Sequence, residues 1–432
     1  MRVTFYTLGC KVNQNETGAL AQLFEENGYT VVSNEESADV YIVNSCTVTN
    51  FGDQKSRKWL RRAKRENPGA VTVLTGCYPQ AFPEEAAEIA EADVVTGSGN
   101  RRAILADVQK VLDGEAERVV DIRPHEKGER FEELPMDKFA EHTRAFVKVE
   151  DGCNRRCAYC VIPRARGPVR SRDEASILDE LRRLADAGYK EVVLTAISLP
   201  SYGTDSGTSL AELIEKAAAV PGIERIRLGS LDPDMLHDED IHRMAAVKKL
   251  CPQFHLSLQS GCDKTLRAMR RPYTTAQYAE IADKLREAFG AENVSFTTDV
   301  IVGFPGETEE DFEASMAFVT GMRFLKAHVF PYSRREGTAA YDFPDQLPEH
   351  EKEARSRRMT AAVEEVRAAE VCAVQGRTAS VLLETPLSAT MFTGYTRQYL
   401  PVLVNAPGCR TGDIVEVTLG EWDGKRCRAA IV

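Results

Sequence analysis

The chain of 432 residues contains no apolar run long enough to cross a bilayer, no short-period repeat and no low-complexity tract. Its first residues, MRVTFYTLGC, have the pattern of a strand and lack the charged-then-apolar layout of a secretory signal. We therefore expect a cytosolic protein with no membrane partner. The length allows two or three domains, because single cores rarely grow beyond about 250–300 residues.

An excess of positive charge is also missing. The net charge is −11 at pH 7, which argues against generic adhesion to nucleic acid. Two local tracks are nevertheless basic: residues 55–65 hold seven basic residues and no acid, and residues 154–172 hold six arginines and no acid. Such tracks favour contacts with phosphates, although the first one could equally be the solvated face of a helix.

The pattern of apolar residues predicts an α/β protein of three domains. In residues 1–112 short strands alternate with amphipathic helices, which predicts a doubly wound parallel sheet. Residues 113–138 are charged and irregular, and we expect a linker there. Six further strand–helix units in residues 139–369 predict a partial (β/α)6 barrel whose site lies at the carboxyl ends of the strands. Residues 370–432 predict a small OB-like β-barrel.

Eleven cysteines in a reducing compartment are not expected to form a disulfide framework. Cys10, Cys46 and Cys77 each follow a predicted strand of the first domain. Because the carboxyl ends of parallel strands share one edge of a sheet, these three thiols could converge although 36 and 31 residues separate them. The alternative is that they are small buried apolar residues, as unpaired cysteines often are.

The segment DGCNRRCAYC places Cys153, Cys157 and Cys160 within eight positions, just after the predicted strand AFVKVE. A loop that leaves a strand end can wrap three thiolates around one centre. Structural zinc requires four closed ligands, and no fourth Cys or His stands nearby at a finger-like spacing. Three thiolates fit a four-iron cube better, because they hold three irons and leave the fourth open for a cofactor.

CNRRCAYC on the first strand of a β/α barrel resembles the signature of the radical S-adenosylmethionine (SAM) superfamily, including the aromatic Tyr159 before the last cysteine. The upstream segments TLGCKVNQNET, IVNSCTVT and LTGCYPQ narrow this resemblance to the methylthiotransferases. Two further blocks, HLSLQSGCDKTLRAMRRPYT and TDVIVGFPGETEEDF, are typical of the same family. The resemblance covers nearly the whole chain.

The resemblance implies two [4Fe–4S] clusters and SAM as cofactors, and a C-terminal barrel of the type called TRAM. One cluster, held by Cys10, Cys46 and Cys77, would carry a sulfur species that a first SAM methylates. The other, held by Cys153, Cys157 and Cys160, would cleave a second SAM to a radical that removes hydrogen from C2 of an adenine. No side chain need act as a general acid or base, so we name no catalytic residue.

Polar side chains at the strand ends of the predicted barrel are candidate contacts for SAM or substrate, although they could also be capping residues at a barrel rim. With Tyr159 they form the predicted cofactor-binding set of Tyr159, Ser230, Ser257, Gln259 and Asp299. One segment, TAISLPSYG, departs from the family pattern at Ala196, Ser198 and Pro200, near the expected methionine moiety of SAM.

The form LGCKVNQNET looks most like the branch that acts on N6-threonylcarbamoyladenosine at position 37 of tRNA, next to the anticodon. The implied partners are the anticodon stem-loop and an electron donor such as a flavodoxin, while the sulfur donor stays open. We expect Tyr395, Arg397 and Tyr399 to offer the RNA a stacking and charged surface. The alternatives are isopentenyladenosine in tRNA, a ribosomal-protein aspartate, or a non-catalytic zinc-binding protein that binds RNA.

Overall fold

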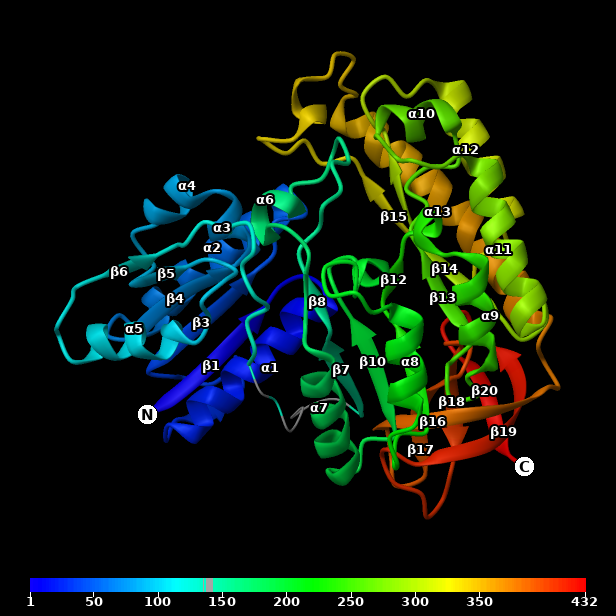
Figure 1. Cartoon of the computed structure of the whole chain (residues 1–432), viewed down its shortest axis with the longest axis horizontal. Coiled ribbons are helices and arrows are strands. Elements are labelled where there is room, and N and C mark those ends of the chain that lie inside the picture. Colours follow the sequence, from blue (N-terminus) through cyan, green and yellow to red (C-terminus); the bar gives the residue numbers. More distant parts are fainter. Residues whose placement is uncertain (135, 137–142) are drawn as a thin grey trace.

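Six parallel strands form the sheet of the first unit, in the order β2–β1–β3–β4–β5–β6 (Figure 1). The computed structural model describes residues 1–134, 136 and 143–432. The strands are β1 Arg2–Thr7, β2 Thr30–Val32, β3 Val40–Ser45, β4 Val71–Gly76, β5 Val94–Thr96 and β6 Val119–Asp121. The helices are α1 Lys11–Glu26, α2 Asn50–Glu66, α3 Cys77–Ala81, α4 Pro83–Ala87 and α5 Ala103–Leu112.

Helices cover both faces of this sheet. Leu20 of α1 and Val108 of α5 pack with Val3 and the other strand residues of one face. Leu60 of α2 packs with Val43 and the α3–α4 segment on the opposite face. The predicted doubly wound sheet is therefore confirmed, and the strand order reverses direction between β1 and β3, which is where such sheets bind ligands.

Two strands of this sheet were not anticipated. β2 and β6 have three residues each, too few to show a clear alternation of apolar and polar side chains. β6 lies inside the stretch expected as a linker, where it adds a parallel strand beside β5. Residues 135 and 137–142 of the predicted linker and barrel domain lie outside the described residues.

The central unit is an open barrel of parallel strands with helices outside. β11 and β12 are separated only by Gly229 and occupy one position, so the sheets β11–β10–β7 and β12–β13–β14–β15 make six positions, as predicted. The strands are β7 Arg144–Lys148, β10 Glu191–Thr195, β11 Arg225–Leu228, β12 Ser230–Leu231, β13 Gln253–Leu256, β14 Ser295–Val302 and β15 Lys326–Pro331. The outer helices are α7 Glu174–Asp186, α8 Leu210–Ala218, α9 Asp238–Ala246, α10 Asp263–Ala268, α11 Thr275–Phe289 and α12 Glu309–Gly321.

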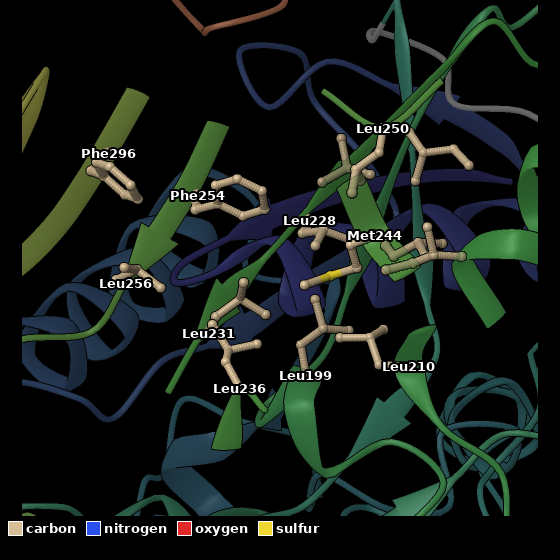
Figure 2. Packing of buried hydrophobic residues seen from close by; sticks show 14 of the residues in the cluster. Leu199, Leu210, Leu228, Leu231, Leu236, Met244, Leu250, Phe254, Leu256 and Phe296 are labelled. Atoms are coloured by element: carbon tan, nitrogen blue, oxygen red, sulfur yellow. The ribbon is translucent and has the colours of Figure 1, made fainter. Parts of the chain in front are cut away.

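The barrel core lies between the strands and their helices. Figure 2 shows Phe254 and Leu256 of β13 close to Phe296 of β14 within this cluster. Along β13 these apolar residues alternate with the polar Gln253 and His255, because successive side chains of a strand point to opposite faces. One face therefore builds the core, and the other is left to line the interior of the barrel.

Short elements flank the loop that contains Cys153, Cys157 and Cys160. After β7 the chain forms β8 Glu150–Asp151, which pairs with β9 Arg170–Ser171, and the helix α6 Ile162–Arg166 lies between them. The long helix α13, Glu349–Cys372, packs against β15 and crosses the boundary expected between residues 369 and 370. No helix among the described residues is long and apolar enough to span a membrane.

The C-terminal unit is a closed barrel of five strands in the order β16–β17–β18–β20–β19, which confirms the predicted small β-barrel. Its strands are β16 Thr378–Pro386, β17 Met391–Thr396, β18 Pro401–Asn405, β19 Ile414–Trp422 and β20 Cys427–Ile431. Figure 1 shows this barrel at the lower end of the central strands, which is the end where they begin.

The turn after β17 closes the base of the central barrel. Arg227 of β11 donates hydrogen bonds to the backbone carbonyls of Thr396 (3.2 Å) and Arg397 (3.0 Å), and it lies over the ring of Tyr399. Tyr399 stacks on Tyr395 with ring centroids 4.5 Å apart. Arg397 also donates to the backbone carbonyl of Leu250 (2.8 Å), so this turn joins the two barrels, and the expected RNA-stacking surface at Tyr395, Arg397 and Tyr399 stays a prediction.

Candidate functional site

Glycines with a left-handed backbone precede three of the six candidate ligand cysteines. Gly9, Gly76 and Gly152 have φ values of +112°, +97° and +99°, which favour glycine. A Cβ atom on Gly152 would lie 1.9 Å from the carbonyl oxygen of Pro168. Each glycine turns the chain sharply at a strand end, so that the following cysteine leaves the sheet at its carboxyl edge.

Cys10, Cys46 and Cys77 gather at this edge, around the point where the strand order reverses. They follow β1, β3 and β4, which are neighbours in the sheet. A Cβ atom on Gly9 would lie 3.2 Å from Sγ of Cys46, so the loop of Cys10 touches Cys46 directly. The predicted convergence of these three thiols is thus consistent with the structure.

Arg166 connects this triad to the second cysteine loop. It is the last residue of α6, six positions after Cys160, and its side chain is fully buried. Its Nε–H donates to Sγ of Cys77 (3.1 Å), and a terminal nitrogen donates to Oδ1 of Asn13 (2.9 Å). Asn13 in turn accepts a hydrogen bond from the thiol of Cys10 (3.4 Å). The two cysteine sets therefore share one hydrogen-bonded frame.

Glu16 of α1 is the acid that balances this buried arginine. Its carboxylate accepts hydrogen bonds from Arg166 and from Lys148 of β7 (2.8 Å), and it forms an ion pair with Arg101 of the first unit (2.8 Å). Burial alone raises the pKa of Glu16, but the three cations outweigh it and lower the pKa to about 2. The network spans the contact between the first unit and the barrel.

The second triad lies in the loop between β8 and α6. Arg271 donates to Sγ of Cys157 (3.4 Å), and the backbone N–H of Cys160 donates to the carbonyl of Cys157 (3.1 Å). Arg271 is held by an ion pair to Asp232 and a hydrogen bond to the hydroxyl of Tyr273 (2.9 Å). A fixed guanidinium thus faces one thiol of the triad.

Burial raises the pKa of several of these thiols and so favours their neutral form. Burial, with a smaller contribution from Cys77, raises the pKa of Cys46 to about 12. Burial likewise raises the pKa of Cys153 to about 11 and that of Cys160 to about 12. Binding of iron would therefore displace protons from these thiols, because thiolate is the ligand form.

The donor sets fit clusters better than single ions. Within the described part of the chain, no three His, Cys, Asp or Glu side chains are placed to hold one metal ion. A four-iron cluster does not require the three side chains to converge on one point, because each thiolate binds a different iron. Three soft thiolates, a backbone turned by glycine and an arginine beside one sulfur are a suitable environment for an iron–sulfur cluster.

A cavity of about 520 Å³ lies in the interior of the central barrel, and Cys10 is part of its wall. Ser230 and Asp299 line the same cavity, together with Ala196 of the segment that departs from the family pattern. The structure therefore brings a cysteine of the first unit together with two of the predicted polar contacts.

The other predicted contacts lie on the same barrel but do not line this cavity. Ser257 and Gln259 are half-buried and follow β13 on its interior face. Tyr159 is half-buried and packs with Ala158 and Phe304. These residues keep their predicted roles as proposals.

The two remaining residues of the departing segment are structural. The backbone N–H of Ser198 donates to Oε2 of Glu150 (2.9 Å), and its hydroxyl contacts that of Ser201 (2.8 Å). Pro200 lies in the following 3-10 turn, Leu199–Ser201. The segment is therefore an ordered turn that rests on the strand before the cysteine loop.

The arginines of the second basic track divide into structural and exposed ones. Arg155 is paired with Asp234 (2.7 Å), and Arg166 is buried as described above. Arg156 and Arg164 are exposed and line a separate pocket that includes Cys153. Arg155 and Arg166 are thus paired with acids of the protein, and Arg164 lies over the ring of Phe82.

The basic track on α2 is partly neutralised. Arg57 is paired with Glu85 of α4, and Lys64 is paired with Asp93 (2.6 Å). Lys55 lies over the exposed ring of Phe51, with its ammonium 4.5 Å from the ring centroid. The alternative interpretation of a solvated, ion-paired helix face therefore applies to much of this track.

Sequence reasoning missed several residues of the cavity wall, among them Lys11, His255 and His328. Burial, together with Arg144 and Arg227, lowers the pKa of Lys11 to about 8. Only the position of Lys11 directly after Cys10 could have drawn attention to it. Nothing in the sequence indicates which side chains of β13 and β15 face the interior.

The chain is similar to two protein-family models and to known proteins. Residues 147–319 match the model of the radical SAM superfamily, and residues 2–97 match that of the uncharacterized protein family UPF0004. The threonylcarbamoyladenosine tRNA methylthiotransferase MtaB of Bacillus subtilis is 39% identical, over 96% of this chain and 93% of its own length. The protein of the same name from Aquifex aeolicus is 41% identical, over 83% of this chain and 86% of its own.

Relatives with a different substrate in their name are also similar. The tRNA-2-methylthio-N(6)-dimethylallyladenosine synthase of Clostridium novyi is 36% identical, over 96% of this chain and 92% of its own length. Among solved structures, the radical SAM methyltransferase TsrM from Kitasatospora setae superposes with a TM-score of 0.55 at 16% identity. That match covers 89% of this chain and 81% of TsrM, and it shows a shared fold.

Proposed function

The chain belongs to the radical SAM methylthiotransferase family, and on this basis we propose that it adds a methylthio group to C2 of N6-threonylcarbamoyladenosine in tRNA. Enzymes of this family use SAM and [4Fe–4S] clusters as cofactors. We infer that position 37, next to the anticodon, is the site of modification.

One observation supports this function above the others: Cys10 of the first unit lines the interior cavity of the barrel. A sulfur-carrying centre must reach the same base as the centre that cleaves SAM. Because the cavity is walled by residues of both units, a base bound there would be accessible from the Cys10 side and from the strand ends above β13 and β14.

The protein side chains have holding and orienting roles in this proposal. Cys10, Cys46 and Cys77 would hold one cluster, and Cys153, Cys157 and Cys160 the other. When bound, these clusters and SAM supply the sulfur and the radical chemistry. Ser230 and Asp299 line the cavity and would orient the bound molecules, while Arg166 and Arg271 stabilise the thiolates of Cys77 and Cys157 by hydrogen bonds.

The RNA would approach over the exposed arginines beside Cys153. Arg156 and Arg164 line a pocket of about 560 Å³ with Cys153, and neither forms an ion pair among the described residues. Phosphate contacts of this kind give affinity for an anticodon stem-loop without reading its sequence. An electron donor such as a flavodoxin and a cytosolic location belong to the same proposal.

The choice of substrate base has one specific competitor. Relatives named for dimethylallyladenosine are nearly as similar as those named for threonylcarbamoyladenosine. We favour the latter because its relatives reach 39% and 41% identity and because the segment LGCKVNQNET has the form of that branch.

The two tRNA substrates can be separated in a strain from which the gene is deleted. Mass spectrometry of the tRNA nucleosides should show loss of the methylthio form of threonylcarbamoyladenosine. Loss of the methylthio form of the isopentenyl nucleoside would instead overturn the choice.

The radical chemistry is tested on the purified, anaerobically reconstituted chain. Replacing Cys153, Cys157 and Cys160 together with alanine should abolish formation of 5′-deoxyadenosine while about four of about eight irons remain, by cluster stoichiometry. Continued formation of 5′-deoxyadenosine would refute the assignment. Zinc at one ion per chain, without iron, would favour the non-catalytic alternative.

A further inference from the structure

We propose that Lys11, together with Lys326, is a specificity-determining residue that pairs with the carboxylate on the N6 substituent of the substrate base. The inference rests on the proposed function and adds to it the group that distinguishes an acidic substituent from an apolar one. Lys11 and Lys326 are two cations in the wall of the interior cavity.

Neither cation has a partner within the described part of the chain. Lys11 is the half-buried first residue of α1, and Lys326 is the exposed first residue of β15. Both line the cavity, and neither makes a hydrogen bond or an ion pair to a described residue. Lys11 is partly withdrawn from water without a partner, which is costly and favours an anionic ligand at this place, and the exposed Lys326 adds positive charge to the same wall.

The buried acid whose charge acts on Lys11, Glu191, is already engaged, while Asp299 lines the same cavity. Glu191 pairs with Arg227 (2.9 Å), and Asp299 lies 3.4 Å from Nε2 of His255. At the base of the cavity, Arg144 is paired with Glu384 of the C-terminal barrel (2.7 Å). Arg367 also lines the cavity but pairs with Glu364 (3.3 Å), so the two lysines are the cations of the described wall that have no ion-pair partner.

The position of Lys11 suits a group attached through N6. Lys11 follows Cys10, whose centre would address C2 of the purine. C2 and the carbon that bears N6 flank the same ring nitrogen, so a substituent on N6 extends along the edge that C2 occupies. A threonylcarbamoyl group ends in a carboxylate on this edge, whereas a dimethylallyl group has no charge to offer a lysine.

The beginning of α1 adds to the attraction for an anion. Cys10 caps this helix without a side-chain hydrogen bond, and the first turn contains no acidic residue. Cys10, Lys11 and Val12 all line the cavity, so the positive end of the 16-residue helix faces it. The positive end of the helix therefore adds to the attraction that Lys11 exerts on an anion.

The part of the cavity wall that β15 forms is suited to a planar base. His328 and Phe330 project from β15 into the cavity wall with their rings nearly parallel, at 20° and 6.5 Å between centroids. The ring of His255 follows at 6.3 Å from that of His328. A purine that enters the cavity could stack on these rings while its N6 edge faces the lysines.

The test compares anticodon stem-loop RNAs that differ only in the modified base: threonylcarbamoyladenosine, its methyl ester, and dimethylallyladenosine. The reconstituted holoenzyme, Lys11→Gln, Lys326→Gln and the double variant are assayed for RNA dissociation constants and for methylthio product by mass spectrometry. We expect the parent protein to bind the acid about 10- to 100-fold more tightly than the ester, the range of a charge-assisted hydrogen bond. The double variant should bring this ratio close to one, and Lys11→Arg should retain most of it.

The matched control is Lys264→Gln, because Lys264 is an exposed lysine of α10 that pairs with Asp311 outside the cavity. It should leave the acid-to-ester ratio unchanged. An unchanged ratio in the double variant would overturn the inference, and so would a loss of iron with equal weakening of all three RNAs, since Lys11 would then act on the cluster. If the parent protein forms no methylthio product from the threonylcarbamoyl RNA, the proposed function itself fails.

Discussion

At the scale of single residues, the conformation of glycine decides where cysteines can stand. Cys10, Cys77 and Cys153 follow glycines whose φ values lie near +100°, at three different strand ends in two different units. A side chain at any of these glycines would strain the backbone. The recurrence shows that the placement of the thiols depends on the residue before each cysteine as much as on the cysteine itself.

Gly152→Ala should therefore remove one cluster site. The new Cβ would lie 1.9 Å from the carbonyl oxygen of Pro168, so the loop that carries Cys153 must shift. Iron after reconstitution should fall from about eight to about four per chain, by cluster stoichiometry. Gly321→Ala is the control, because a Cβ there meets no atom within 4 Å. Full iron content in Gly152→Ala would contradict the interpretation.

The buried carboxylate of Glu16 makes stability depend on acid. Its pKa falls from 4.5 in the unfolded chain to about 2 in the folded one, so the folded state is stabilised above pH 4.5 and loses this stabilisation as the pH falls toward 2. The full effect is about 3 kcal/mol, at about 1.4 kcal/mol per pH unit. Urea unfolding of the cluster-free chain and of its Glu16→Gln variant gives the free energy of unfolding of each. The difference between the two free energies should be large at pH 7 and smaller at pH 3. A difference of the same size at both pH values would exclude this role.

At the scale of elements, α1 serves the sheet, the barrel and the cavity at once. Its apolar side packs on the first sheet, and its polar side lies along the free edge of β7 (Figure 1). Asn15 donates from its side-chain amide to the backbone carbonyl of Phe146 (2.6 Å). An exposed strand edge invites pairing with other chains, so covering it also protects the open barrel.

Asn15→Ala should accordingly lower the free energy of unfolding by about 1–3 kcal/mol, the range for a buried hydrogen bond whose partner is removed. Urea denaturation of the cluster-free chain gives the measurement. Asn27→Ala is the matched control, because Asn27 makes its side-chain hydrogen bond to Leu23 at an exposed position. An equal decrease in the free energy of unfolding of the two variants would show that the hydrogen bond from α1 to β7 makes no specific contribution to stability.

At the scale of the whole molecule, the three units form one body through buried charges. Glu16 and Arg166 join the first unit to the barrel, while Arg225 and Arg227 of the barrel reach Ser380 (2.8 Å) and the turn after β17. The C-terminal barrel thus forms the floor of the interior cavity. Tyr395 and Tyr399 of this barrel line the cavity.

Arg227→Met tests this arrangement. It removes the partner that lies nearest to the buried Glu191 and leaves Arg225 at 3.4 Å, and removal of one partner of a buried pair costs about 3–5 kcal/mol. Thermal unfolding followed by circular dichroism should show the loss, and limited proteolysis should release the C-terminal barrel more readily. Arg243→Gln is the control: it breaks an exposed pair with Glu215 and should change neither measurement. Unchanged proteolysis of Arg227→Met would mean that the floor is held by other contacts.

The sequence by itself determined the succession of elements and the family. Alternating apolar patterns gave the parallel sheet, the six barrel positions and the closed C-terminal barrel, because these patterns report burial along each strand. It missed β2, β6 and β17, since β2 and β6 are short and β17 has no strong apolar run. The spacing of the cysteines carried the expectation of two clusters, because ligand chemistry is local to each loop.

Only the tertiary structure decided which charged and aromatic side chains are available to a partner. From the sequence, Arg155, Arg156, Arg164 and Arg166 are equivalent, yet two of them are bound to acids or to Cys77, because those partners come from distant segments. In the same way, Lys11 became a candidate ligand group because Glu191, the buried acid whose charge acts on it, is taken by an arginine of another strand. Pairing of charges depends on distances in space, which a single sequence does not contain.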